Sequence, residues 1–548
     1  MNARDLARRH WGIIALVAVA APLLFAFNSQ DRLASFGDDS ASYLTLAHYF
    51  GGARGNADAA AWAAHHSHFP PLFPLLLWLS GGASDYRVAY VLVAACAAIA
   101  LPLIYRHAAA ELGGVREGLA VTVLFLLMPT AWISTKGILS ESLYLLLLMA
   151  ALVHFGARVA IERARATDLL VFGTLLACAT LTRMLGIALL FAYLAHLGMR
   201  AIADRRLPAL REFLPALPAV LLLSLWHGLR PRADVDGYGR SAQQIIGKWI
   251  ADPGGMLRAA ADFFSSGWIA SFTAEAAVSD EARLAILSIG ALALGGVVLR
   301  VARNRLDGWF LLLSLGILFP WVFTPDNTRR LLYPLIPLLL VCAADFLLWG
   351  TARLSLQSRS RALVVGAVAI MTVALTIPAL LLIQRKAGDR AIVLPGQAYA
   401  YRDITEYYTT INVERARERV QLVVATLSGL ESIGAVTPAG ARVMWMRPEY
   451  IGLLGHRRGV RFLFRWSAPE LAAEVKKAGV DYVVDTWLLK TDLEGVQGDP
   501  HVDTAAYAKP SFRLGEIFVL MRVDRAALDG YLATLTSGQP APDRAPAR

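Results

Sequence analysis

Two neighbouring acidic residues, Asp38 and Asp39, follow the first long apolar segment and are the first candidates for chemistry in this sequence. Residues 40–50 have helical spacing with an apolar stripe, which suits a helix at a membrane interface. A carboxylate facing an apolar interface is expected to have a raised pKa, which strengthens it as a general base. A second interpretation is that Asp38 or Asp39 only caps this helix by accepting backbone N–H groups. Because two acids are adjacent, one can cap the helix while the other does chemistry.

A pair of arginines, Arg329 and Arg330, lies between two late apolar segments, on the membrane side where other loops carry few positive residues. A guanidinium at a membrane boundary can hold a lipid-borne phosphate with two parallel hydrogen bonds. The alternative is that these side chains extend toward the membrane surface or pair with Asp326. Arg183, between two earlier segments at the same face, is a second and weaker candidate for binding phosphate.

Three clustered histidines, His65, His66 and His68, precede a rigid Pro70-Pro71 elbow. Together with Asp39 they are candidate ligands for a divalent metal ion, since imidazole and carboxylate suit zinc or manganese. The other interpretation is that histidines at an interface are solvated or cap a helix. Asp234-Val235-Asp236 has the D-x-D spacing of nucleotide-sugar enzymes, but no neighbouring glycine-rich turn offers a cradle for nucleotide phosphates, so we expect no nucleotide cofactor.

The composition predicts an integral membrane protein. Of the 548 residues, 56% are hydrophobic and 17% charged, which is too much apolar surface for an ordinary soluble domain. The net charge of +11 is concentrated in short loops between apolar segments, where it sets orientation, so nucleic-acid binding is not expected. Cys96, Cys178 and Cys342 all fall inside apolar segments, which supports neither a disulfide framework nor a cysteine metal site.

About eleven transmembrane helices are predicted from the apolar runs. The expected spans are 11–27, 86–105, 116–133, 140–157, 168–182, 184–199, 213–229, 282–301, 308–323, 331–350 and 362–383. Every even-numbered span is followed by arginine-rich sequence, so these loops and the amino terminus are placed in the cytoplasm. The acidic stretch, the loop 230–281 and the tail then lie on the non-cytoplasmic face. We expect interfacial helices in loops 28–85 and 230–281.

Beyond residue 384 the pattern changes to that of a small non-cytoplasmic α/β domain, residues 385–548, with a disordered end. Helices are expected at 403–430, 449–455 and 469–478, and strands at 442–446, 461–466, 481–485 and 516–523. The predicted fold is thus a mainly α-helical polytopic membrane region, residues 1–384, followed by a soluble α/β domain.

Several of these stretches together resemble the polytopic GT-C glycosyltransferases, especially the branch containing protein O-mannosyltransferases and the aminoarabinose transferase that modifies lipid A. The similar motifs are Asp39-Ser40-x-x-Tyr43-x-x-Leu46-Ala47, His68-x-Pro70-Pro71-Leu72-x-Pro74-Leu75, Ser140-Glu141-Ser142-Leu143, Arg330-Leu331-Leu332-Tyr333-Pro334-Leu335-x-Pro337, and, in the tail, Thr437-Pro438-x-x-Ala441 and Arg447-Pro448 followed by Gly455-His456-Arg457. Their order, spacing and shared membrane side make the combination more specific than each motif alone.

The resemblance implies transfer of a sugar, with inversion, from a polyprenyl-phosphate donor to a lipid, glycan or protein acceptor on the non-cytoplasmic face. Asp39 would be the general base, while Glu141 would orient Asp39 or a metal ion, or else serve as a structural partner of an arginine. Arg330 or Arg329 would stabilise the leaving phosphate. Substrate contacts are expected from Tyr43, His68 and Tyr333. The implied location is the inner membrane, with the tail periplasmic or extracellular.

A membrane transporter or lipid flippase is the main competing class, because many helices with a few boundary charges are typical of transporters too. It does not readily explain an acidic interfacial helix, a Pro-Pro elbow and a large external domain. No pair of broken helices in corresponding halves indicates the inverted repeats of a transporter. A receptor or scaffold is a third possibility, but it leaves Asp39 and Arg330 without a task.

Overall fold

A computed structural model describes residues 3–28, 31–33, 39–52, 55–66, 69–160, 164–229, 237–274, 278–354, 358–388, 392–393, 400–401, 413–462, 467–486, 504 and 506–536. The helices of the first 388 residues are α1 (Ala3–Asn28), α2 (Ser40–Gly51), α3 (Ala57–His66), α4 (Leu72–Ser80), α5 (Tyr86–Leu112), α6 (Val115–Leu127), α7 (Pro129–Ile133), α8 (Glu141–His154), η2 (Phe155–Val159), α9 (Ala166–Thr182), η3 (Met184–Gly186), α10 (Ile187–Asp204), η4 (Leu210–Phe213), α11 (Ala216–Leu229), α12 (Gly237–Ala251), α13 (Pro253–Thr273), α14 (Asp280–Ala302), α15 (Leu306–Leu318), η5 (Phe319–Trp321), α16 (Pro325–Leu332), α17 (Ile336–Arg353) and α18 (Ser358–Gly388).

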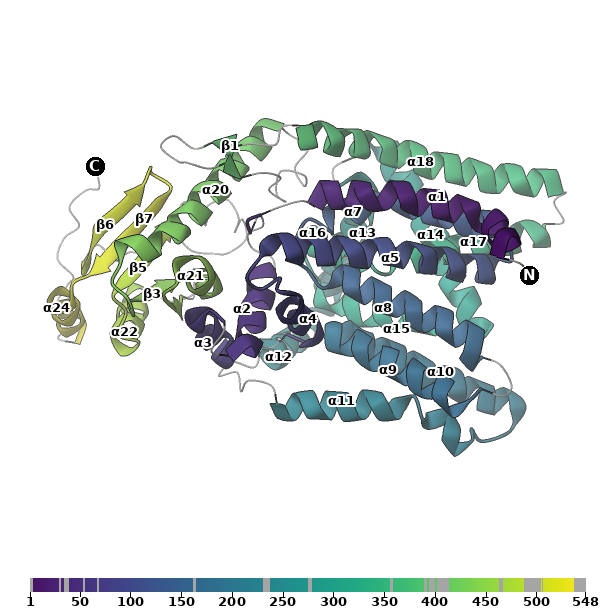
Figure 1. The fold of residues 1–548 in the computed structure, drawn as a ribbon, viewed down its shortest axis with the longest axis horizontal. Coiled ribbons are helices and arrows are strands. Elements are labelled where there is room, and N and C mark those ends of the chain that lie inside the picture. The colour runs from purple at the N-terminus through teal and green to yellow at the C-terminus, as the bar shows by residue number, and fades with distance from the viewer. Residues whose placement is uncertain are drawn as a thin grey trace.

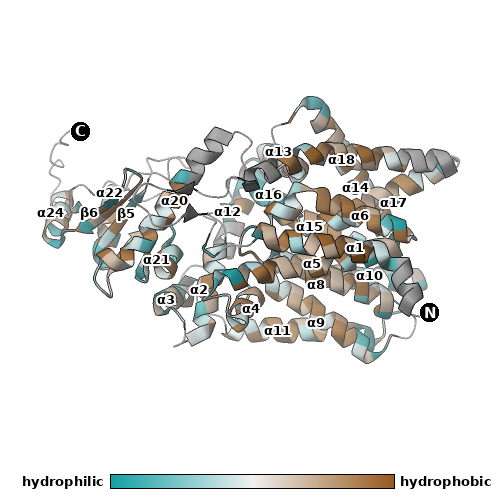
Figure 2. Ribbon diagram, turned by 45° about the horizontal axis from the view of Figure 1, so that its top comes forward, coloured by the Kyte–Doolittle hydropathy of each residue, from teal (hydrophilic) through white to brown (hydrophobic). Residues whose placement is uncertain are grey.

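The long helices form a bundle in which α5 packs against α1 and α8, α9 against α8 and α11, and α14 against α17 (Figure 1). Among the described residues, seven helices are long and apolar enough to cross a membrane. The apolar parts of α9, α15 and α18 are shorter, at 10–17 residues. Hydrophobic residues predominate along the bundle, as Figure 2 shows. The predicted multi-pass membrane region is therefore confirmed, while the count of eleven spans stays a prediction.

Prolines explain where three expected spans differ from the observed helices. The expected span 116–133 is divided into α6 and α7, with Pro129 in the first turn of α7. The expected span 331–350 begins later, at Ile336, because α16 ends at Leu332 and Pro337 lies in the first turn of α17. In the expected span 308–323, α15 ends before Pro320 and the chain tightens into the short helix η5. A proline lacks the N–H that a helix interior needs, so it is favoured where a helix begins.

The tail forms an α/β domain with a mixed five-stranded sheet, and so confirms the predicted class. Its elements are β1 (Ile392–Val393), β2 (Ala400–Tyr401), α20 (Val413–Val436), β3 (Arg442–Trp445), α21 (Pro448–Gly455), β4 (Arg458–Arg461), α22 (Ala468–Lys477), β5 (Tyr482–Thr486), β6 (Ala508–Leu514), β7 (Phe518–Val523) and α24 (Arg525–Thr536). The sheet order is β4-β3-β5-β7-β6, with β3 parallel to β4 and β5. Strand β7 is antiparallel to β5 and β6.

Some elements of this domain differ from those expected from the sequence. Strand β4 precedes the expected strand 461–466, of which residues 463–466 lie outside the described part. Strand β6 and helix α24 were not predicted. The start of the expected helix 403–430, the disordered end and the boundary at residue 384 are not tested by the described residues.

The tail domain is joined to the loop helices by one continuous hydrophobic core. This core contains Tyr43 and Ala47 of α2 and Ala59 of α3, together with Leu430 of α20 and Ile451 of α21, all buried. Polar contacts cross the same boundary, since Arg32 pairs with Glu431 at 3.0 Å and the Asn56 amide donates to the Gly452 carbonyl at 2.8 Å. Helix α2 therefore packs inside the protein, and its apolar stripe does not lie open at the membrane interface as we expected.

Trp268 of α13 lies in the loop 230–281, where we expected interfacial helices, but its side chain is buried in the bundle. Its ring is only 6% exposed and its indole N–H donates to the Ile286 carbonyl at 2.9 Å, inside the bundle core.

Gly452 allows α21 to approach α3 closely, and we expect Gly452→Ala to destabilise the docked domain. An added Cβ would lie 2.9 Å from the Ala59 Cα and 3.0 Å from its backbone nitrogen, atoms that cannot rotate away. Overpacking of this kind costs about 1–3 kcal/mol. The matched control is Gly530→Ala in α24, where a Cβ meets nothing within 4 Å and the substitution should stabilise by roughly 0.5–1 kcal/mol. Thermal unfolding of both variants measures the difference. Equal shifts would contradict the close approach.

Candidate active site

The carboxylate of Asp39 meets the guanidinium of Arg330 at the end of the bundle that faces the tail domain. The distance from Arg330 Nη2 to Asp39 Oδ2 is 2.6 Å. Asp39 precedes α2 but makes no side-chain capping bond to it, so the capping interpretation does not apply to Asp39. Both side chains remain partly accessible, at 27% for Asp39 and 19% for Arg330. The two residues, which are 291 positions apart, thus form one polar site open to a ligand.

Glu141, the first residue of α8, connects Arg330 to Arg183. One of its carboxylate oxygens lies 3.0 Å from Arg330 Nε and 2.7 Å from Arg183 Nη1. The Glu141 side chain is fully buried, whereas Arg183 is 11% exposed. A buried carboxylate between two guanidiniums fixes the position of both. The structure favours the role of an arginine partner for Glu141, since its contacts among the described residues are with Arg183 and Arg330.

Hydroxyl groups connect helix α2 to the loop before α8. The Tyr43 hydroxyl is 2.8 Å from the Ser140 hydroxyl, which also accepts from Arg183 at 3.3 Å. The backbone N–H of Ile138 donates to the Ser40 hydroxyl at 3.1 Å. These contacts come from residues adjacent to Asp39 and Glu141 in sequence. These contacts therefore hold the segment that carries Asp39 in place relative to the segment that carries Glu141.

The electrostatic surroundings of Asp39 differ from our expectation. Burial raises the pKa of Asp39, but the positive charges of Arg330, Arg183 and Arg447 lower it, and the net result is a pKa below the ordinary value of 3.8. The raised pKa predicted from an apolar interface is therefore wrong. The physical reason is that three guanidiniums from distant parts of the chain converge on this carboxylate.

Arg447 lies near the site although it was not among the residues expected there. It precedes α21 in the tail domain, where its Nε lies 2.8 Å from Glu449 and its guanidinium lies over the Tyr450 ring. Its charge nevertheless acts on Asp39. The Arg447-Pro448 dipeptide was part of the resemblance, but nothing local in the sequence indicates a residue more than 400 positions away from Asp39.

The described contacts of Arg329 differ from those of its neighbour Arg330. Its guanidinium lies 3.6 Å from Asp326 and donates to the Ala274 carbonyl at 3.4 Å. This agrees with the alternative of pairing with Asp326. Successive helical residues point in directions about 100° apart, which explains why, among the described contacts, Arg330 meets Asp39 whereas Arg329 meets Asp326.

Tyr43 and Tyr333 are positioned differently from the substrate contacts we expected. Tyr43 is 2% exposed, with its ring packed edgewise between Phe69 and Phe73 at 5.0 and 5.2 Å. Tyr333 is fully buried and its ring lies 5.8 Å from that of Phe125. Neither ring has a face open to a sugar, so both contribute to packing in this arrangement.

The expected metal ligands are only partly described. His65 is exposed near the end of α3, while His68, the side chain of His66 and the acidic residue Asp38 lie outside the described residues. Within the described part of the chain, no group of three His, Cys, Asp or Glu side chains is arranged to hold a metal ion. Asp39 and Glu141 are both committed to guanidiniums. Metal binding therefore stays a prediction.

No protein-family model and no curated protein sequence matches this chain, and its similarity to known proteins is one of structure. The structure of ArnT from Cupriavidus metallidurans bound to undecaprenyl phosphate aligns with a TM-score of 0.50 at 12% identity, covering 93% of this chain and 97% of that one. The oligosaccharyltransferase of Archaeoglobus fulgidus, tethered with an acceptor peptide containing the NVT sequon, aligns with a TM-score of 0.52 at 12% identity, covering 95% and 75%. The apo form of ArnT aligns with a TM-score of 0.50 at 14% identity, covering 94% and 98%.

These alignments extend over nearly the whole chain, bundle and tail domain alike. The chain therefore has the fold of the GT-C glycosyltransferases, as the sequence motifs indicated. At such low identity the comparison establishes the fold, and the site has to be interpreted from its own residues.

Proposed function

We propose that this protein is a membrane glycosyltransferase that transfers a sugar from a polyprenyl-phosphate donor to a lipid, glycan or protein acceptor on the non-cytoplasmic face. The observation that carries the proposal is the 2.6 Å contact between Asp39 and Arg330, a base and a phosphate-binding group at one end of a membrane bundle. The GT-C fold supports it, since ArnT of that fold binds undecaprenyl phosphate.

The location of the arginine-rich loops supports the proposed orientation. Arginines lie at or just after the carboxyl ends of four helices, α5, α10, α14 and α17. These ends are at the side of the bundle away from Asp39 (Figure 1). Positive loops stay on the cytoplasmic side, so Asp39 and the tail domain face the other side. In a bacterium this would place the site in the periplasm or outside the cell.

The ion pair has to open for the reaction to occur, because a sugar cannot fit between groups 2.6 Å apart. The donor phosphate attracts Arg330 away from Asp39, while Glu141 keeps hold of the Arg330 Nε. Removal of a nearby positive charge raises the pKa of Asp39 and makes it a stronger base. Donor binding thus raises the pKa of Asp39, so that the base becomes stronger when a donor is in place to react with the acceptor.

Asp39 then takes the proton from the acceptor hydroxyl as that oxygen attacks the anomeric carbon of the sugar. The bond from this carbon to the phosphate oxygen breaks, and its electron pair leaves with the polyprenyl phosphate. Arg330 stabilises the negative charge that develops there, and Arg183 adds to the positive potential. Attack from the face opposite the phosphate inverts the anomeric carbon. Glu141 acts through the arginines and is a positioning residue.

Donor turnover tests the proposal. Purified protein in detergent would be incubated with a panel of polyprenyl-phosphate sugars and crude membrane acceptors, and free polyprenyl phosphate measured. We expect release from one donor class and transfer of its sugar to an acceptor fraction. A protein that moves the intact donor between liposome leaflets without releasing polyprenyl phosphate would be a flippase, and the proposal would be wrong.

A further inference from the structure

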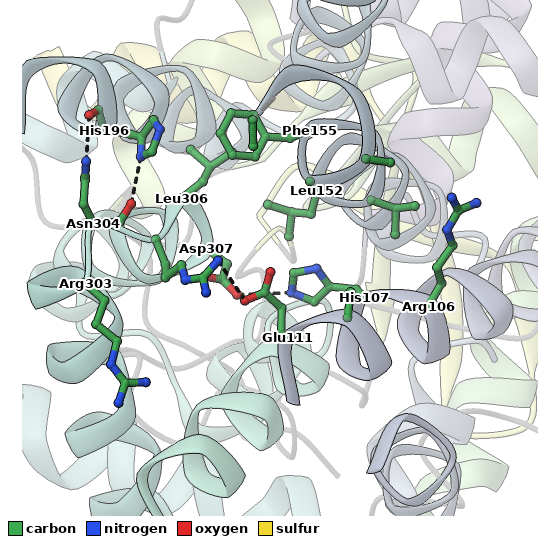
Figure 3. A pocket seen from close by; sticks show the side chains of 16 residues that line it. Arg106, His107, Glu111, Leu152, Phe155, His196, Arg303, Asn304, Leu306 and Asp307 are labelled. Atoms are coloured by element: carbon green, nitrogen blue, oxygen red, sulfur yellow. Dashed lines mark hydrogen bonds and ion pairs between the residues drawn. The ribbon is translucent and has the colours of Figure 1, made fainter. Parts of the chain in front are cut away.

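A cavity of about 730 Å³ lies at the end of the bundle remote from Asp39 (Figure 3). It is enclosed by the last turns of α5, the segment from α8 into η2, helix α10 and the turn between α14 and α15. Helix α8 begins at Glu141 in the candidate active site and ends at His154 beside the cavity. At 1.5 Å per residue the two ends are about 20 Å apart. The cavity is therefore separate from the Asp39 site.

Arginines surround this cavity on two sides. Arg106 of α5 lies on one side in Figure 3, and Arg303 with the Asn304 turn lies on the other. Arg305, which follows Asn304, also lines the cavity. The side chains of Arg303 and Arg305 are 41% and 56% exposed, and Arg106 is exposed as well. Their charges thus remain available to a ligand that arrives from solvent or from the membrane surface.

The turn that carries Arg303 and Arg305 is held rigidly. Asn304 between them has a left-handed backbone with φ of 52°. Its side-chain amide donates to the His196 carbonyl at 3.1 Å, and the His196 Nδ1 lies 2.8 Å from the Asn304 carbonyl. The Trp309 indole also donates to the Asn304 side chain at 2.9 Å. The two arginines are therefore presented by a fixed turn clamped to α10.

The acidic residues of the cavity are committed to other partners. Asp307 accepts from buried Arg300 at 2.7 and 3.0 Å and lies 3.1 Å from His107. Glu111 pairs with Arg300 too, and its distance to Arg305 is 3.9 Å. Counting Asp345, which pairs with Arg300 and Arg303, four arginines face three carboxylates. The excess is positive, because the contact between Arg305 and Glu111 is long and Arg106 has no carboxylate partner among the described residues.

One wall of the cavity is apolar, and part of this wall borders open space. It is formed by Leu152, Phe155 and the small residues Gly156, Ala157 and Ala160. Residues 155–159 form a turn of π-helix, a rare element that is frequent at functional sites. A Cβ on Gly156 would meet nothing within 4 Å. The wall offers a surface along which a hydrocarbon chain can lie.

We propose that this cavity binds the head group of an anionic phospholipid, with the phosphate between Arg106 and Arg305 and the acyl chain along the wall of Phe155 and Gly156. Basic pockets between transmembrane helices recognise anionic lipid head groups in this way. Guanidinium groups suit phosphate oxygens, and the apolar wall suits a lipid better than a soluble phosphate. The proposal does not depend on the reaction at Asp39.

The test uses the full chain, purified in a neutral detergent and stripped of lipid. Dioleoyl phosphatidylglycerol would be titrated in mixed micelles, with phosphatidylcholine and inorganic phosphate as comparison ligands, and lipid retained by the protein counted by native mass spectrometry. The cavity variant is Arg106→Gln with Arg305→Gln. The matched control is Arg116→Gln with Arg353→Gln, two exposed arginines at the same end of the bundle that do not line the cavity.

We expect the wild type to retain phosphatidylglycerol in preference to phosphatidylcholine. Loss of two arginines from the cavity should weaken phosphatidylglycerol binding about thirtyfold, and the control should match the wild type. Arg106→Lys with Arg305→Lys should restore most of the binding. Equal weakening in the control would show that the arginines act only through general surface charge, and would overturn the proposal. Binding of inorganic phosphate without any preference for phosphatidylglycerol would overturn it as well.

Discussion

Asp39→Asn should lower donor turnover by about 10²–10⁴-fold while leaving the fold intact. The amide has the shape of the carboxylate and its oxygen can still accept from Arg330, so the helix and its hydroxyl contacts should persist. What it loses is the ability to take a proton from the acceptor. Release of polyprenyl phosphate, measured beside thermal unfolding, separates the two effects.

Asp326→Asn is the matched control for this substitution. It removes a carboxylate at the same end of the bundle, but that side chain is 72% exposed and pairs with Arg329. We expect its turnover to stay near that of the wild type. If Asp39→Asn kept more than about half of the wild-type rate, Asp39 would not be the base, and a role in anchoring Arg330 alone would replace it.

Arg330→Gln is expected to lower kcat/KM for the donor by about 10²–10³-fold, because it removes the group that we propose stabilises the leaving phosphate. Arg329→Gln is its neighbour control, since that guanidinium is held by Asp326 and the Ala274 carbonyl. Steady-state kinetics with varied donor distinguish the two variants. Equal losses of kcat/KM in both variants would indicate that α16 as a whole is disturbed, and would contradict a specific role for Arg330.

The pH dependence of Arg330→Gln should also shift, and its direction follows from the charges around Asp39. The base works deprotonated, so kcat/KM falls as pH falls through the pKa of Asp39 in the free enzyme. Burial raises that pKa, but Arg330 and two other arginines bring it below 3.8 in the wild type. The wild type should therefore lose activity only at a pH below the usual titration range of an aspartate. Without Arg330 the acid limb should move to higher pH, and an unchanged limb would contradict this electrostatic coupling.

Much of the architecture could be predicted from the sequence, because lipid leaves few structural options and membrane helices must be long and apolar. Arginine-rich loops then indicated which segment ends share a face. This is why Asp39, Glu141, Arg183 and Arg330, far apart in the chain, were all expected at one end of the bundle. The structure does bring these four side chains into one connected group.

The features that could not be predicted depend on contacts between residues far apart in the sequence, which no local pattern reveals. The pKa of Asp39 was predicted in the wrong direction because its apolar setting is visible in the sequence, whereas the approach of Arg447 from the tail domain is not. Tyr43 has the residue type of a sugar-binding ring, but its environment of Phe69 and Phe73 depends on the path of the chain through the Pro-Pro elbow. Helical spacing showed which side of α2 was apolar and did not show that protein would cover it.

The shared core of the loop helices and the tail domain sets the order in which this protein can mature. Arg32 and Asn56 find their partners Glu431 and Gly452 only 399 and 396 residues later in the chain. A ribosome adding 5–20 residues per second needs roughly 20–80 s to produce that interval. During this time α3 and α4 can already pack on α2, but the part of α2 that contacts α21 has no cover. The charged group around Asp39, which includes the field of Arg447 from the tail domain, is therefore among the last features of the newborn chain to be completed.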